Sequence, residues 1–360
     1  MTSNSGLRPR WASAPGETIE SIIRERELDP SEVAAGLSLS RSDFEQLIGG
    51  RHPITVSLAS RLSKVLGASS EFWMTREAQY VDDTNRVAAD RWSSTLPIKQ
   101  MAKFGWIDPP QGWHDRIDAC FEFFSVSDVE SWESTYFREV ENAHYRRSPS
   151  FTLEQTATAV WFRACERAAE DLADLNQYDP DKFRSAIYDV KKLTRIKDPQ
   201  IFLPKLLDTC AGAGVAVSVV PAPSGCPASG AARWFADNPL IQLSARHLTD
   251  DHFWFSFFHE AGHVLLHDVS SPFIDLLEDE SADGFENDAN KFAISTLFGT
   301  EPIPTPSRWT TRTLIATAQA LNIAPGLIVG HLQHIGTLPH SHFNKLKRRY
   351  KWTGSTLEMR

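Results

Sequence analysis

The sequence contains little cysteine and lacks the spacings that cysteine pairs adopt in metal or disulfide sites. Its four cysteines are widely separated and form no CxxC motif: Cys120, Cys165, Cys210 and Cys226. Neither a zinc knuckle nor a disulfide framework is therefore predicted. We expect the four thiols to be small, buried, apolar side chains.

Long apolar runs are also missing. No stretch approaches the roughly 18 consecutive apolar residues that a membrane-spanning helix needs. Residues 1–16, MTSNSGLRPRWASAPG, contain no apolar core of a signal peptide. These absences predict a cytoplasmic protein without a membrane partner.

The chain has no excess of positive charge, because 37 Lys and Arg stand against 46 Asp and Glu, for a formal net charge of −9. Bulk charge therefore gives no reason to expect nucleic-acid binding, and any DNA contact must come from a local patch. The length of 360 residues exceeds that of one typical domain and predicts two or three.

Hydrophobic periodicity predicts a mainly α fold with a small α+β part. The first predicted regions are a disordered lead-in at 1–15, a bundle of short helices at 16–80 and a helical middle region at 81–200. An α+β domain at 201–300 and a helical C-terminal region with a basic tail at 301–360 follow. Within the α+β domain we expect a buried strand over 213–220 and a hairpin over 231–244 that turns at Asp237-Asn238-Pro239. For residues 116–128, helix and strand both remain open.

A short helix-like segment, FFHEAGHVLLHD at 257–268, contains His259-Glu260-x-x-His263. Residues four apart lie on one face of a helix, so both imidazoles can reach one metal ion. Glu260 then stands beside the ion as a general base, which is the HExxH arrangement of zinc peptidases. The rest of the helix is apolar, and burying an unpaired polar group costs about 1–3 kcal/mol. These polar side chains are therefore expected to have a chemical role.

Zinc in hydrolases usually takes three protein ligands and leaves one position for water. We favour Glu286 in GFENDANKFA as the third ligand, with Asn290, one turn on, bonded to a ligand histidine from outside. His267 is the alternative, but three ligands on consecutive turns of one helix suit a tetrahedral ion poorly, so an outer role is expected for it. The expected cofactor is Zn²⁺, with Mn²⁺ as the alternative.

Two further parts of a peptidase site are expected. Stabilisation of the oxyanion requires a donor besides the metal, and the candidates, which the sequence does not rank, are Arg233, His247, His331 and His334. A strand that runs antiparallel to the substrate commonly precedes the metal helix, and NPLIQLS at 238–244 is the candidate for it.

Residues 30–55, PSEVAAGLSLSRSDFEQLIGGRHPIT, resemble a helix-turn-helix, with Ser40–Leu47 as the recognition helix. The DNA-binding residues that we predict are at the start of this helix and on the flanking backbone-contacting positions: Arg41, Ser42, Arg51 and Arg61. Asp43 and Glu45 on the same helix would repel phosphate. A protein-docking module is therefore the alternative to a DNA reader.

Two stretches are similar to known families. Positions 15–76 resemble the HigA-type antitoxin branch of the Xre helix-turn-helix family, above all in the run from Arg51 to Trp73, RHPITVSLASRLSKVLGASSEFW. Positions from about 205 to 300 resemble the ImmA/IrrE metallopeptidase family, in FSFFHEAGHVLLH followed by ENDANKFA.

The second resemblance implies a gluzincin-like zinc-peptidase fold, with the metal held by His259, His263 and Glu286 and with Glu260 as the base. It also implies a regulatory endopeptidase that cleaves a partner protein, a DNA-binding repressor or an antitoxin. The helix-turn-helix head would then bind operator DNA, as a homodimer, or the partner. The alternative is a transcriptional regulator or antitoxin whose metal domain senses without cutting.

Overall fold

The computed structural model describes residues 10–137, 153–170, 175–267, 273–274, 284–303 and 306–360. These residues are mainly helical with small sheets, which confirms the predicted mainly α class with a small β part. The chain divides into two compact units, residues 1–93 and 94–360. Residues 1–9 of the predicted lead-in lie outside the described part. The boundaries predicted at 80, 200 and 300 stay predictions.

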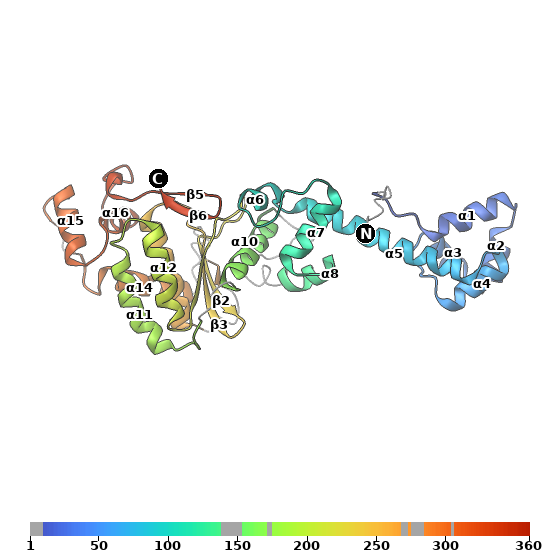
Figure 1. The fold of residues 1–360 in the computed structure, drawn as a ribbon, viewed down its shortest axis with the longest axis horizontal. Helices are drawn as coiled ribbons and strands as arrows, with labels where there is room; N and C mark the ends of the chain where they lie inside the picture. The colour runs from blue at the N-terminus through green and yellow to red at the C-terminus, as the bar shows by residue number, and fades with distance from the viewer. Residues whose placement is uncertain (1–9, 138–152, 171–174, 268–272, 275–283, 304–305) are drawn as a thin grey trace, which may run out of the picture. The chain divides into compact units, whose positions relative to one another are not determined.

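The first unit is a bundle of short helices followed by the start of a long one (Figure 1). The helices are α1 (Pro15–Glu25), α2 (Pro30–Gly36), α3 (Arg41–Ile48), α4 (Val56–Leu66) and α5 (Ser70–Thr95). Side chains of Asp29, Ser40 and Thr55 accept backbone N–H bonds at the starts of α2, α3 and α4, which satisfies donors that a helix start leaves open. One apolar cluster unites the bundle: Ile19, Leu37, Leu47, Leu58, Leu62 and Trp73 are among its buried members.

The second unit begins with helices that precede any strand. They are α6 (Ile98–Lys103), α7 (Trp113–Phe124), α8 (Val129–Trp132), the π-helical turn η1 (Glu133–Phe137), α10 (Leu153–Glu170), α11 (Pro180–Leu193) and α12 (Pro199–Ala211). The segment 116–128, for which the sequence left helix and strand open, belongs largely to α7. This helix ends at Phe124, and the next residue, Ser125, has a left-handed φ of 55°.

A four-stranded sheet follows, made of β1 (Ala216–Val219), β2 (Gly230–Phe235), β3 (Asn238–Leu243) and β4 (Phe273–Ile274). Its order is β1-β3-β2-β4, with β1 parallel to β3 and the other pairs antiparallel. The predicted strand and hairpin are therefore present. The predicted turn is displaced, because β3 already begins at Asn238 and the chain reverses at Ala236 and Asp237, where Ala236 has a φ of 51°.

Helices cover both faces of this sheet (Figure 1). On one face, Leu240 packs with Ala169 of α10. On the other face, Ala232 and Ile241 join a large core that includes Phe202 of α12 and Phe257 of the metal helix. Burial on both faces explains why the strands read as nearly continuous apolar runs rather than as an alternating pattern.

The metal motif lies on α13 (Asp250–Leu266), and α14 (Gly284–Phe298) packs against it. The helices α15 (Thr311–Ala320) and α16 (Pro325–His334) follow. Within the described ranges, no single helix has the length and apolarity to cross a membrane, whereas α15 and α16 meet that criterion only as a pair bent by 106°.

The C-terminal region contains strands in addition to the predicted helices and basic residues. After the 3-10 turn η2 (Asn344–Leu346), the chain forms a hairpin of β5 (Tyr350–Thr353) and β6 (Thr356–Met359). Lys347 Nζ lies 2.6 Å from an Asp251 carboxylate oxygen, and the Arg348 backbone N–H donates to Asp250 at 3.0 Å. The Arg348 guanidinium also donates to carbonyls at the end of α11. The basic residues are thus used to hold the start of α13.

Asp250 should make stability fall as pH rises. Burial first, and then the charge of Asp251, raises the pKa of Asp250 from 3.8 to about 7, with Arg348 acting in the opposite direction. The folded chain therefore binds the Asp250 proton more tightly than the unfolded chain does. The stabilisation that this proton provides is complete below about pH 4 and is lost as pH rises through 7. Between pH 5 and pH 7.5, wild type should lose about 2–3 kcal/mol of unfolding free energy relative to Asp250→Asn.

Urea unfolding at the two pH values measures this difference. Asp208→Asn, which changes an exposed carboxyl group on α12, is the matched control and should track wild type at both values. A gap between wild type and Asp250→Asn that is independent of pH would contradict the raised pKa.

Candidate metal centre

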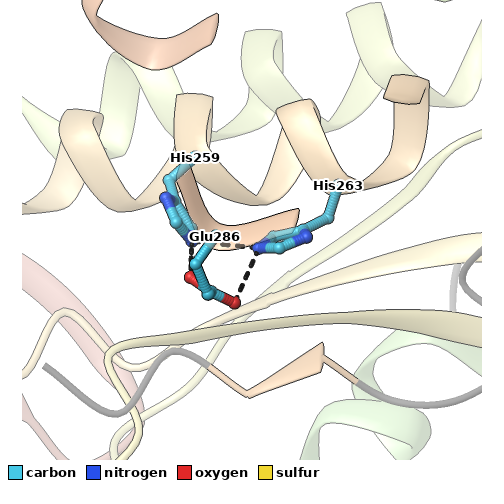
Figure 2. Close-up of side chains that lie close together, drawn as sticks. All are labelled: His259, His263 and Glu286. Atoms are coloured by element: carbon cyan, nitrogen blue, oxygen red, sulfur yellow. Dashed lines mark hydrogen bonds and ion pairs between the residues drawn. The ribbon is translucent and has the colours of Figure 1, made fainter. Parts of the chain in front are cut away.

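One turn of α13 places His259 and His263 side by side, facing the same space (Figure 2). Their Nε2 atoms lie 3.1 Å apart. Both side chains are almost fully buried, at 2% and 1% exposure. The i, i+4 spacing in the sequence therefore produces the paired imidazoles that it predicts.

Glu286 approaches this pair from α14 (Figure 2). Its two carboxylate oxygens lie 3.1 Å from His259 Nε2 and 3.2 Å from His263 Nε2. One donor atom from each of the three residues lies within 4.8 Å of the others. The favoured third ligand thus joins the two histidines, from the helix on which it was predicted.

A glycine allows the two helices to come close enough. A Cβ atom built on Gly262 would lie 3.1 Å from the Ala289 Cα and 3.2 Å from Phe292. Such contacts are tighter than packed side chains normally tolerate. Gly262, between the two histidines, and Ala289, one turn from Glu286, therefore let α14 bring its carboxylate to α13.

The outer nitrogens of both histidines also have partners. His259 Nδ1 lies 3.0 Å from Asn290 Oδ1. An amide oxygen only accepts hydrogen bonds, so Nδ1 carries the proton and Nε2 keeps its lone pair for a metal ion. His263 Nδ1 lies 3.1 Å from His267 Nδ1. Asn290 and His267 therefore lie against the outer nitrogens of His259 and His263.

The electrostatics of the three residues suit a cation. Burial acts to raise the pKa of Glu286, but the His259 and His263 rings that face its two oxygens outweigh burial and hold this pKa below its ordinary value. The carboxyl group is therefore ionised. Two imidazole nitrogens and one carboxylate form a donor set that zinc hydrolases use, so these residues fit a zinc ion.

Glu260 follows His259 on α13 and is fully buried, at 0% exposure. It packs against the backbone of β2, where a Cβ atom on Gly230 would collide with the carboxyl end of Glu260. Only glycine leaves this space. Sequence reasoning missed Gly230, because nothing in the sequence pairs residue 230 with residue 260, and only the packing of α13 on β2 brings them together.

The candidates for oxyanion stabilisation are not in the donor cluster. Arg233 is buried on the α10 face of the sheet, where its guanidinium pairs with Glu166 and lies 5.0 Å from the Phe162 ring centroid. His247 stacks on His252, with ring centroids 4.1 Å apart. His331 and His334 line a separate pocket at α16. No donor for the oxyanion follows from these positions.

The prediction that residues 238–244 pair with a substrate is wrong. β3 is hydrogen-bonded to β1 on one side and to β2 on the other, so neither of its edges is open. The apolar pattern of NPLIQLS matches an interior strand as well as an edge strand, and only the parallel pairing with β1 decides between them.

The four predicted DNA-binding residues all lie in the first unit, but in different settings. Arg41 Nε lies 3.0 Å from Glu45 Oε1, an exposed pair within α3. Ser42, also on α3, and Arg51 are exposed, whereas Arg61 on α4 is half-buried. Part of the expected positive surface is thus neutralised by the acid one turn away.

Residues 215–317 match the family model described as the IrrE N-terminal-like domain, Peptidase_M78. The matched segment contains α13, α14 and all three potential ligands. It supports the ImmA/IrrE part of the resemblance and implies a hydrolase of the metallopeptidase type with a metal cofactor, typically zinc. No curated protein and no solved structure matches the chain.

Proposed function

We propose that this chain is a regulatory, zinc-dependent endopeptidase with a gluzincin-like peptidase domain, which cleaves a partner protein that is a repressor or an antitoxin. One observation carries the proposal: a fully buried Glu260 directly follows His259 of the His259, His263 and Glu286 cluster on α13, within the segment that matches a peptidase family. A structural metal site has no need of a fourth, non-ligating carboxylate in that position.

The chemistry divides between the ion and the chain. When bound, the zinc ion supplies Lewis-acid chemistry, which polarises a carbonyl and makes water more acidic. Glu260 accepts the proton of the attacking water and donates it to the leaving amine. Asn290 holds the His259 ring in the tautomer that leaves Nε2 free. The apolar residues of α13 exclude bulk water from this side of the site, which strengthens the electrostatic interactions within it.

The test is a search for new protein N-termini. The full chain, loaded with zinc, is incubated with a bacterial proteome that includes the proteins encoded beside it, and the N-termini are labelled and sequenced. We expect one or a few cleavage sites, in a DNA-binding or antitoxin protein, that disappear when a chelator is present. General degradation, or no zinc-dependent site in any protein, would overturn the proposal.

Gly230→Ala should lower cleavage strongly while leaving the metal bound. The added Cβ takes the space of the Glu260 carboxyl end, so the base is displaced although no ligand is changed. General-base catalysis is worth about 10²–10⁴-fold, and we expect kcat to fall within that range. Gly212→Ala is the matched control, since its Cβ would make only an ordinary contact, 3.5 Å from the Asp208 carbonyl oxygen. Full activity of Gly230→Ala would show that Glu260 does not need its present position.

The head, residues 16–80, is proposed to be a helix-turn-helix that binds operator DNA as a homodimer. Support comes from the succession of α2 and α3 with a tight turn between them, in which Ser38 has a φ of 54°. Glycine favours this left-handed conformation, and the sequence has Ser38 where such turns usually have glycine. The Arg41–Glu45 pair favours the docking alternative, because it reduces the charge that α3 offers to phosphate.

Salt dependence separates DNA binding from protein docking. A head that contacts DNA phosphates through Arg51 and its neighbours releases counterions on binding. The logarithm of the affinity for operator DNA should therefore fall linearly with the logarithm of the salt concentration, with a slope of about −0.9 per phosphate contact. Fluorescence anisotropy with a labelled duplex of the adjacent promoter region measures this slope for wild type and for Arg51→Ala. A slope near zero, unchanged in the variant, would favour docking on a protein.

A regulator whose metal domain senses without cutting is the second candidate. The complete burial of Glu260 favours it, since a general base must meet water and substrate. The same N-terminal search decides between the two candidates, because a sensor produces no new N-termini with or without zinc. A vestigial HExxH is the least favoured reading, since it offers no reason to retain Glu260.

A further inference from the structure

A pocket lies beside the metal helix, where α13, α14 and α16 meet. It encloses about 200 Å³ and reaches the C-terminal segment at His340 and Lys347. An apolar cavity of about 150 Å³ already accommodates benzene. The space therefore suits one aromatic ring with a small substituent and is too small for a folded partner or a peptide segment.

The floor of this pocket is apolar. It is formed by side chains from the three helices: Phe255 on α13, Ile294, Leu297 and Phe298 on α14, and Leu327 on α16. Burying the face of a ring against such side chains is favourable at about 25 cal/mol per Å² of apolar surface. The floor therefore selects a flat, apolar group.

The rim of the pocket is rich in hydrogen-bond donors, and burial lowers the pKa of His252 and His331, so these two imidazoles are neutral N–H donors at pH 7. Four imidazoles, those of His252, His331, His334 and His340, and the ammonium of Lys347 line it. Among the described residues that line the pocket, Asp251 is the sole acid, and its carboxylate lies 2.6 Å from Lys347 Nζ. An incoming anion therefore meets hydrogen-bond donors and no uncompensated negative charge.

We propose that this pocket binds a small aromatic carboxylate, with the ring on the apolar floor and the carboxylate among the imidazoles at the rim. Small-molecule sites typically combine an apolar floor with a small number of polar groups that point toward the ligand. None of the three potential metal ligands lines this pocket, and ligand binding there does not depend on the proposed peptidase activity.

A ligand in this pocket would contact both helices that carry the potential metal ligands, α13 and α14. Phe255 lines the pocket and stacks near the ring of His259, with centroids 6.3 Å apart. Ile294 is on α14, which also carries Glu286. A ligand that fixes the side chains of Phe255 and Ile294 would therefore change the positions of both helices that supply metal ligands. Such coupling between two sites is what control by a small molecule requires.

Fluorine NMR of 4-fluorobenzoate with the full chain tests the proposal. Because a carboxylate can also ligate zinc directly, the titration is made with zinc-loaded and with chelator-treated, metal-free protein. We expect a dissociation constant below about 1 mM in both forms. Binding seen only with zinc would place the carboxylate on the metal and overturn the proposal.

Two variants locate the site. Ile294→Trp fills the pocket from α14 and should weaken binding at least 10-fold. Ile201→Trp makes the same change at a half-exposed isoleucine on α12 that does not line the pocket, and should stay within 2-fold of wild type. Thermal melts of both variants show that they fold. Equal binding by the two folded variants would exclude this pocket.

A neutral comparator tests the chemistry of the rim. 4-Fluorobenzamide has the same ring and nearly the same shape, but no charge. We expect it to bind at least 5-fold more weakly than 4-fluorobenzoate. Equal affinities would show that the rim does not select an anion and would overturn the assignment of a carboxylate.

Discussion

Glu260→Gln should abolish cleavage and leave metal binding intact. Glutamine has almost the same shape as glutamate, so the fit against Gly230 is kept, but its amide cannot accept the proton of the attacking water. Glu260 is not part of the His259, His263 and Glu286 cluster, so the metal keeps all its protein ligands. We expect kcat to fall by about 10²–10⁴-fold or more, with KM little changed.

The measurement uses whichever cleavage site the N-terminal search identifies, as a synthetic peptide or as the intact partner. Its matched control is Gln319→Glu, which makes the reverse exchange at an exposed position on α15 and should leave kcat unchanged. If Glu260→Gln keeps full activity with zinc bound, Glu260 is not the general base. The second candidate function, a sensor that does not cut, predicts no activity in either protein.

Glu286→Ala should weaken zinc binding by at least about 10-fold. Removal of an outer partner of a metal ligand already costs about 10–100-fold in affinity, and Glu286 is a ligand in this account. Its loss leaves two imidazoles, which form an incomplete donor set for a catalytic zinc ion. Competition with a chromophoric chelator measures the dissociation constant for zinc.

His267→Ala provides the comparison for Glu286→Ala. His267 contacts the outer nitrogen of His263 and so supports a ligand from behind. Its removal should weaken zinc binding, but less than removal of Glu286 does. Glu301→Ala, at an exposed carboxyl group beyond the end of α14, should have no effect. If His267→Ala costs more affinity than Glu286→Ala, the third ligand has been assigned to the wrong residue.

The metal cluster could be predicted from the sequence because its geometry is mostly local. His259 and His263 are four residues apart on one helix, and this spacing alone puts them on one face. The link to Glu286 is longer, but the distance of Asn290 from Glu286 repeats the same spacing, and the structure places Asn290 against His259. Local periodicity also predicted the short helices of the first unit and the hairpin 231–244, but it left helix and strand open over 116–128.

The features that sequence reasoning missed all depend on contacts between distant parts of the chain. Gly230 meets Glu260 only because α13 packs on β2. β3 proved to be an interior strand because β1, more than 20 residues earlier, pairs with it in parallel. Lys347 and Arg348 belong to the predicted basic tail, and only the structure shows that they contact Asp251 and Asp250 at the start of α13. No pattern along the sequence encodes these pairings.

The most direct test of the central claim is the metal content of the purified full chain, measured by elemental analysis. The account predicts close to one zinc, or one manganese, per chain in wild type, and a large loss in the double variant His259→Ala/His263→Ala. Less than about a tenth of an equivalent in wild type, even after incubation with zinc, or equal metal in the double variant, would contradict a metal centre at His259, His263 and Glu286.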